Sequence, residues 1–188
     1  MNKIILLLVS ISVLSCATPR FTHRKFFNCS GHSGFNLDTD KRQLIYAILN
    51  KALITKKDIP DYILITDKTK IYIRDEWSSF EFGGMEEPKF YPLNTSDIPS
   101  KINGIQFCVK SISELQEIAD ATNDFWYLTF LNIEIGENTA QIGLTNYPMM
   151  STKNKEKYIS LAGGGYVLEF KKINGRWEFV KMNLSFIS

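Results

Sequence analysis

The sequence predicts a protein of the α+β class, in which an N-terminal amphipathic helix packs on a curved antiparallel sheet that ends in a meander. Two observations predict this class. Apolar residues after Asp40 recur with the period of a helix, and several apolar runs in residues 125–188 have the length and alternation of strands. Between the last two runs stands Asn174-Gly175, which is a strong signal for a two-residue hairpin turn.

The first helix is expected over residues 40–56. Asp40 is the expected N-cap, and Gln43 three residues later completes a pattern like the capping box. Apolar side chains then form one stripe: Leu44, Ile45, Ile48, Leu49, Ala52 and Leu53. A lysine pair at the end of this stretch suits the helix dipole, and Pro60 prevents its continuation.

The next stretch is expected to be extended and then irregular. Residues 61–75 predict two short strands joined in a hairpin around Asp67-Lys68. Residues 75–100 contain a glycine pair, three prolines and six acidic side chains, so regular pairing is not expected there. A loop of this length is uncommon unless it is functional or mobile. Because its aromatic side chains are costly to leave in water, this loop is the candidate contact surface, with Trp77, Phe80, Phe82, Glu86 and Glu87 as its residues.

A strand, a second helix and the meander complete the domain. Residues 104–110 form an apolar strand pattern, after which Ser111 and Glu114 predict a capping box that starts a short helix. In the final strand, Val180, Met182, Leu184 and Phe186 alternate and are expected to share one face. The expected strands of the meander cover residues 125–135, 139–147, 165–173 and 176–188.

The first fifteen residues have the pattern of an export signal. Lys3 precedes a mostly apolar run of about eleven residues, whereas a spanning helix needs about 20 and a secretory signal about 7–15. The run ends Val13-Leu14-Ser15-Cys16, which resembles the lipobox of bacterial lipoproteins. That resemblance implies cleavage before Cys16, a diacylglycerol on its thiol, and acylation of the new amine. Two or more acyl chains would anchor the protein stably, since each buried methylene contributes about 0.8 kcal/mol.

The same resemblance predicts the organisation and location of the protein. Residues 1–15 would be the signal peptide, residues 16–37 the lipidated cysteine and a tether, and residues 38–188 a single α+β domain. Ala17 follows the cysteine, and the tether has no acidic cluster directly after it. We therefore expect the periplasmic face of the outer membrane, with the membrane surface of a Gram-positive cell as the alternative.

Charge and residue types exclude several functions. With 22 basic and 20 acidic side chains, the chain lacks the positive balance of a nucleic-acid-binding protein. His23, Cys29 and His32 match no zinc spacing, so no metal or cofactor is expected. No histidine follows residue 32, which argues against hydrolysis by a Ser-His-Asp or Cys-His arrangement.

Cys29 and Cys108 leave two alternatives. In an oxidising compartment they could form a disulfide, and closing so long a loop would stabilise the fold by about 4–5 kcal/mol in principle. However, Cys108 lies in an apolar strand, where a buried free thiol is ordinary.

The end of the chain suggests a fold family. The stretch EFKKINGRWEFVKMNLSF resembles the last hairpin of cystatin-like and nuclear-transport-factor-2-like folds, in which a Lys-x-Asn-Gly-x-Trp turn joins two long strands. In ketosteroid-isomerase-like relatives a carboxylate inside the sheet acts as the proton-abstracting base. Glu169 is the candidate for that role, although no residue can be assigned as the oxyanion donor.

Two functions follow from these observations. The favoured one is a lipid-anchored binding module whose sheet concavity and 75–100 loop contact a protein or a small apolar ligand. The alternative is a small isomerase- or hydratase-like enzyme that uses Glu169. We expect the binding module, because no catalytic motif is present.

Overall fold

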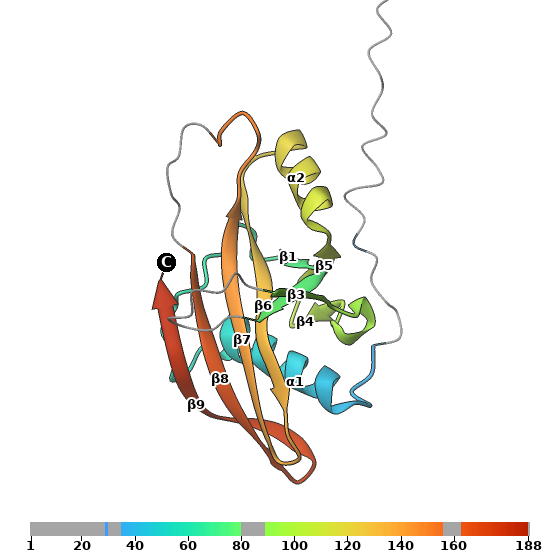
Figure 1. Ribbon diagram of the computed structural model, residues 1–188, viewed down its shortest axis with the longest axis vertical. Coiled ribbons are helices and arrows are strands. Elements are labelled where there is room, and N and C mark those ends of the chain that lie inside the picture. The colour runs from blue at the N-terminus through green and yellow to red at the C-terminus, as the bar shows by residue number, and fades with distance from the viewer. Residues whose placement is uncertain (1–28, 30–34, 80–88, 156–162, 188) are drawn as a thin grey trace, which may run out of the picture.

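The computed structural model describes residues 29, 35–79, 89–155 and 163–187, which form an α+β fold around one strongly curled mixed sheet (Figure 1). The α+β class is therefore confirmed. In chain order the elements are α1 (Asp40–Leu49), a π-helical turn (Asn50–Thr55), β1 (Lys70–Arg74), β2 (Glu76–Ser79), β3 (Lys89–Pro92), a 3-10 turn (Thr95–Asp97), β4 (Lys101–Ile102), β5 (Ile105–Lys110), α2 (Ile112–Ala121), β6 (Phe125–Ile135), β7 (Thr139–Met149), β8 (Gly164–Ile173) and β9 (Arg176–Ile187).

The sheet is mixed, so the expectation of a purely antiparallel sheet was wrong. Its strand order is β4-β5-β1-β6-β7-β8-β9, and β2 pairs with β3 and β6. Strands β6 to β9 form the expected antiparallel meander, but β1 runs parallel to both β5 and β6. Long connections allow this arrangement, as parallel strands require: residues 75–104 connect β1 to β5, and α2 then connects β5 to β6 on the other side of β1.

Helix α1 starts one residue earlier than the sequence suggested. Thr39 is the N-cap, and its hydroxyl accepts a hydrogen bond of 3.3 Å from the Arg42 backbone N–H. Asp40 lies in the first turn and forms an ion pair of 2.6 Å with Lys172 of β8. The Gln43 side chain donates to the Leu37 carbonyl instead of closing a capping box.

The two helices cover opposite faces of the sheet. Four fully buried residues of α1 pack against Leu128 and Phe130 of β6 and against β8; they are Leu44, Ile45, Ile48 and Leu49. Tyr127, which directly precedes Leu128 in β6, belongs instead to the cluster of α2. Since successive side chains of a strand point to opposite faces, α1 and α2 must lie on different sides of β6.

The start of α2 confirms the predicted capping box. The Ser111 hydroxyl accepts from the Glu114 backbone N–H at 3.2 Å, and the Glu114 carboxylate accepts from the Ser111 backbone N–H at 2.9 Å.

The hairpin predicted for residues 61–75 is wrong, because only β1 forms a strand there. The preceding backbone is bonded by side chains from elsewhere in the sequence. The Tyr62 N–H donates to the Tyr166 hydroxyl at 2.8 Å, and the Leu64 carbonyl accepts from Asn146 at 3.1 Å. Backbone groups that already have partners do not need a second strand.

The predicted turn between the last two strands is confirmed. Strands β8 and β9 pair on either side of Asn174-Gly175, and both turn residues have positive φ angles of 49° and 76°.

The expected single apolar face of β9 is wrong, because the β8–β9 register shifts twice. Phe170 pairs with Phe179 while the preceding residue Glu169 pairs with Lys181, so Val180 is an extra residue. The second shift has the same effect at Asn183. Each bulge reverses the alternation of side chains, and Val180 is consequently 48% exposed.

Cys29 and Cys108 form a disulfide whose Cα atoms are 4.8 Å apart. The bond joins residues separated by 79 positions and attaches the segment before α1 to β5. Of the two alternatives that the sequence left open, the structure has the bridged one.

Candidate functional site

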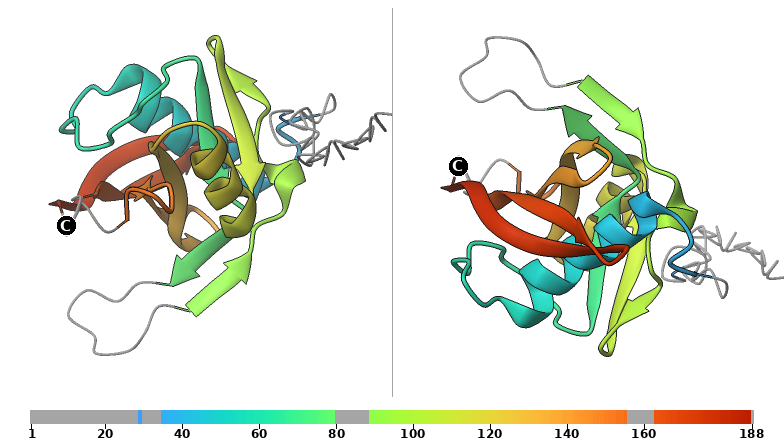
Figure 2. Two further views of the ribbon diagram at one scale, coloured as in Figure 1. Left: turned by 90° about the horizontal axis from the view of Figure 1, so that it is seen from above. Right: turned by 90° about the horizontal axis from the view of Figure 1, so that it is seen from below.

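The predicted contact loop contains paired strands. Trp77 of β2 lies opposite Tyr91 of β3, and their rings stack with centroids 4.5 Å apart. Irregular structure was expected here because of the prolines and glycines, but an aromatic cross-strand pair stabilises a two-stranded ribbon. In both views of Figure 2 these strands lie on the side of the molecule opposite α1. The other predicted contact residues lie outside the described part of the chain: Phe80, Phe82, Glu86 and Glu87.

Glu169 lies on the face of β8 opposite Leu168 and Phe170, as expected from alternation, with its side chain 25% exposed. The carboxylate forms an ion pair of 3.5 Å with Lys181 and accepts a hydrogen bond of 3.3 Å from the Asn183 amide. These contacts are those of a surface ion pair. Glu169 also does not line the groove between α1 and the β8–β9 hairpin, which is the candidate site.

The remaining residues considered for lipid or metal attachment lie outside the described part of the chain: Cys16, His23 and His32. Within the described ranges, no group of three or more His, Cys, Asp or Glu side chains could hold a metal ion. No described helix is long and apolar enough to cross a bilayer.

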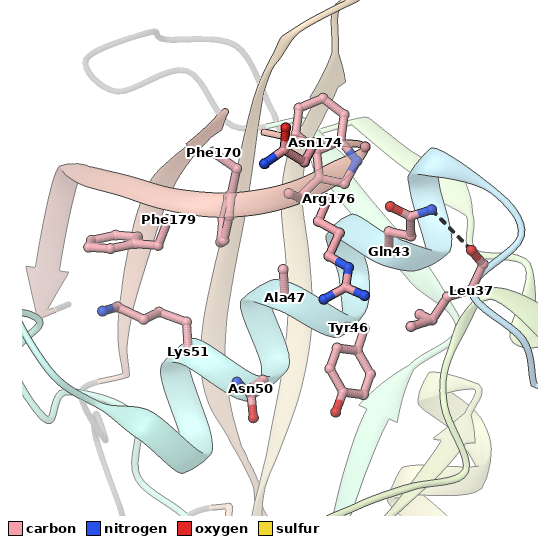
Figure 3. Close-up of a pocket in the computed structure, with 12 residues that line it drawn as sticks. Leu37, Gln43, Tyr46, Ala47, Asn50, Lys51, Phe170, Asn174, Arg176 and Phe179 are labelled. Carbon is pink, nitrogen blue, oxygen red and sulfur yellow. Dashed lines mark hydrogen bonds between the residues drawn. The ribbon is translucent and has the colours of Figure 1, made fainter. Parts of the chain in front are cut away.

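An open groove lies between α1 and the end of the β8–β9 hairpin (Figure 3). Its volume is about 630 Å³, within the range of small-molecule sites. The groove has apolar, amide and cationic side chains. The apolar group is Leu37, Tyr46, Ala47, Phe170, Trp177 and Phe179, the amides are Gln43, Asn50 and Asn174, and the cations are Lys51 and Arg176.

The α1 side of the groove follows from helix spacing. Gln43, Ala47 and Lys51 are four residues apart, as are Tyr46 and Asn50, so both rows face the same side. The short side chain of Ala47 leaves space between the longer ones, which gives the groove its depth.

The opposite side is formed by the two last strands. Phe170 and Phe179 are cross-strand partners, and their rings meet edge-on with centroids 6.1 Å apart. Trp177 fixes this end of the hairpin to the helix, because its indole N–H donates to the Asp40 carbonyl at 3.1 Å. The turn residue Asn174 and Arg176, the first residue of β9, therefore line the groove across from α1 (Figure 3).

Lys51 is held within the groove by an aromatic ring. Its Nζ lies 3.9 Å from the centroid of the Phe179 ring, and its side chain is only 11% exposed. Burial lowers the pKa of Lys51; Asp58, at 3.9 Å, opposes this effect and Lys57 adds to it. The Asp58 carboxylate is 63% exposed, so it compensates the buried ammonium weakly.

Two further polar groups of the groove lack full pairing. The Gln43 side-chain oxygen is buried and has no hydrogen-bond partner among the described residues. The Arg176 guanidinium also lines the groove, and none of the described lining residues is acidic. The groove therefore presents positive charge and one unpaired acceptor, the Gln43 oxygen, beside aromatic surface.

The groove was not predicted from the sequence. The four-residue spacing of Gln43, Ala47 and Lys51 was available as a signal for one helix face. Nothing in the sequence indicated that residues 174–179 would pack over that face.

No protein-family model, curated protein or solved structure matches the chain.

Proposed function

We propose that this protein is a lipid-anchored binding module of the bacterial cell envelope, held at the periplasmic face of the outer membrane by acyl chains on Cys16. The lipobox-like pattern that ends at this cysteine supports the anchor. The disulfide between Cys29 and Cys108 fits an oxidising compartment outside the cytoplasm.

The observation that carries the binding function is the groove between α1 and the β8–β9 hairpin. It combines aromatic surface with a few polar groups, which is the usual composition of a small-molecule site. Among its described lining residues there is no histidine, cysteine or carboxylate that could act as nucleophile or general base. Binding without chemistry is therefore the function that its side chains suit best.

We propose further that the domain is a distant form of the cystatin-like or nuclear-transport-factor-2-like folds. Support comes from α1 packed on the curled β6–β9 meander and from the Asn174-Gly175 turn beside Trp177. The parallel placement of β1 between β5 and β6 departs from a simple meander.

The anchor can be tested by metabolic labelling with a radioactive fatty acid. The wild-type protein should carry label and partition into detergent, whereas Cys16→Ala should do neither. Cys29→Ser serves as the matched control and should keep its label. A mature protein that begins elsewhere and remains soluble would contradict the anchor.

The binding function can be tested with protein extracted from its native membrane. Small molecules that copurify with the wild-type chain should be found by mass spectrometry and should be lost in Ala47→Phe, which fills the middle of the groove. Ile135→Phe, at an exposed position on β6 away from the groove, is the control. Retention of the same molecules by a folded Ala47→Phe variant would show that the groove does not bind them.

A further inference from the structure

Building on the proposed function, we infer that the groove between α1 and the β8–β9 hairpin binds a small amphipathic anion: one acidic group, such as a carboxylate, sulfonate or phosphate, joined to an aromatic or aliphatic body. The inference combines the charge of the groove, the position of its apolar surface and the charge of the chain before α1.

Charge is the first argument. Among the described residues, two cations, Lys51 and Arg176, line the groove and no acidic side chain does. Lys51 has the exposed Asp58 at 3.9 Å, whereas Arg176 has no acidic partner in the described part of the chain. Elsewhere on the described surface, basic side chains often have an acidic partner in contact, as Lys172 has Asp40 at 2.6 Å and Lys56 has Asp61 at 2.7 Å. An arginine without such a partner presents a forked set of donors that matches an oxyanion.

The arrangement of apolar surface is the second argument. Figure 3 shows Arg176 extending from the strand toward α1, above Tyr46, whereas Lys51 points toward Phe179. Ala47 and Phe170 lie between the two cations in the same view. A ligand whose acidic group meets Arg176 would therefore place its body on Ala47 and Phe170, and the 630 Å³ available suits a small molecule.

The sequence before α1 argues against the chain itself as the occupant. Residues 17–37 contain Arg20, Arg24 and Lys25 and no acidic residue. A basic segment is repelled by a basic groove, so charge complementarity favours an external anion.

The experiment compares two dyes that share one aromatic body. Anilinonaphthalene sulfonate carries an anionic group, and N-phenylnaphthylamine lacks it. Both fluoresce on entering apolar sites, so each can be titrated with the chain from residue 17 onward. This chain keeps every residue of the two buried clusters and both cysteines of the disulfide.

We expect the sulfonate to bind at one site per chain and more tightly than the neutral dye. Arg176→Gln should weaken the sulfonate at least about tenfold and leave the neutral dye unchanged. Lys51→Met, which keeps the apolar stem over Phe179, should also weaken the sulfonate. Lys171→Gln removes one charge from an exposed site outside the groove and should have no effect.

Other results would distinguish a wrong anion preference from a failure of the binding function itself. If both dyes bind equally and Ala47→Phe abolishes both, the groove binds ligands but the preference for anions is wrong. If neither dye saturates, the binding function of the groove fails as well. Flotation with phosphatidylglycerol vesicles provides the last comparison: vesicle binding that depends on Arg176, without dye binding, would make this surface a membrane contact and overturn the inference.

Discussion

At the residue scale, a few side chains carry long-range hydrogen bonds that fix the core. Tyr166 is fully buried, and its hydroxyl accepts from the Tyr62 N–H and donates to the Pro60 carbonyl. The ring thereby holds the chain that follows α1 against β8. Because that chain does not pair as a strand, these side-chain bonds replace the ladder that would otherwise satisfy its backbone.

We predict that Tyr166→Phe lowers the free energy of unfolding by about 1–3 kcal/mol, because it leaves a backbone donor and a backbone acceptor without their partner. Urea denaturation would measure the change. Tyr91→Phe is the matched control, since Tyr91 is 39% exposed and its stacking on Trp77 needs only the ring. Equal stabilities of the two variants would contradict the role given to the buried hydroxyl.

Glu114 gives a prediction about pH. Burial alone would raise the pKa of this carboxyl, but hydrogen bonds from the Ser111 backbone and from Lys110 outweigh burial and lower it. The unfolded state therefore binds more protons in acid, so stability rises with pH. The contribution of Glu114 should be fully present above the usual glutamate pKa and lost as the pH falls through the lowered, folded-state pKa.

Urea denaturation of wild type and Glu114→Ala at pH 7 and in acid checks this expectation. We expect a loss of about 1 kcal/mol at pH 7, typical of a removed cap, and a smaller difference below the folded-state pKa. Glu117→Ala, on the same helix, is the control and should change stability little at either pH. A difference that does not depend on pH would rule out the ionised carboxylate as its cause.

At the element scale, departures from regular strands determine which side chains face the core. The bulge at Val180 places Phe179 and Met182, which are three residues apart, against the same core cluster. Phe179 itself pairs in regular register with Phe170, so its position beside Lys51 follows from the regular end of the hairpin. The bulges therefore change which later side chains of β9 face the core, which the alternation of apolar residues does not reveal, and they leave the groove-lining end of the hairpin regular.

A close approach of strands β6 and β7 gives a further prediction at this scale. A Cβ atom on Gly143 would lie 2.6 Å from the Leu131 Cβ, so Gly143→Ala must displace the backbone of one strand. We expect a loss of about 1–3 kcal/mol in the free energy of unfolding. Thr139→Ala at the exposed start of the same strand is the control. An unchanged urea midpoint for Gly143→Ala would mean that the strands separate more easily than their pairing suggests.

At the scale of the whole molecule, one covalent bond joins parts of the chain that are far apart in sequence. The disulfide between Cys29 and Cys108 attaches the segment before α1 to β5, near the edge of the sheet. If Cys16 carries the lipid, this bond also shortens the tether between membrane and domain. The groove lies between α1 and the other end of the sheet, formed by β8 and β9.

We predict that Cys29→Ser with Cys108→Ala lowers the free energy of unfolding by about 4–5 kcal/mol at most, because a loop of 79 residues is no longer closed in the unfolded chain. The domain should still fold, since Cys29 belongs to neither buried cluster. Thermal denaturation with and without reductant measures the effect. A double variant as stable as the oxidised protein would show that the bond does not stabilise the fold.

The sequence by itself determined the features that depend on neighbouring residues. The Ser111-Glu114 capping box and the Asn174-Gly175 turn were predicted correctly because their bonds span only a few positions. The lipobox-like pattern is equally local, and it predicts a location that the fold does not test.

Tertiary structure alone decided the parallel partners of β1, the pairing of β2 with β3, the bulges of β9 and the groove. Each depends on contacts between residues distant in the chain, such as Ala47 and Arg176, which line one groove from either side. A hydrophobic pattern records that a side chain is buried, but it does not record against which partner. For this reason the sequence predicted a binding module without a site, and only the packing of α1 against β8 and β9 formed the groove that we propose as that site.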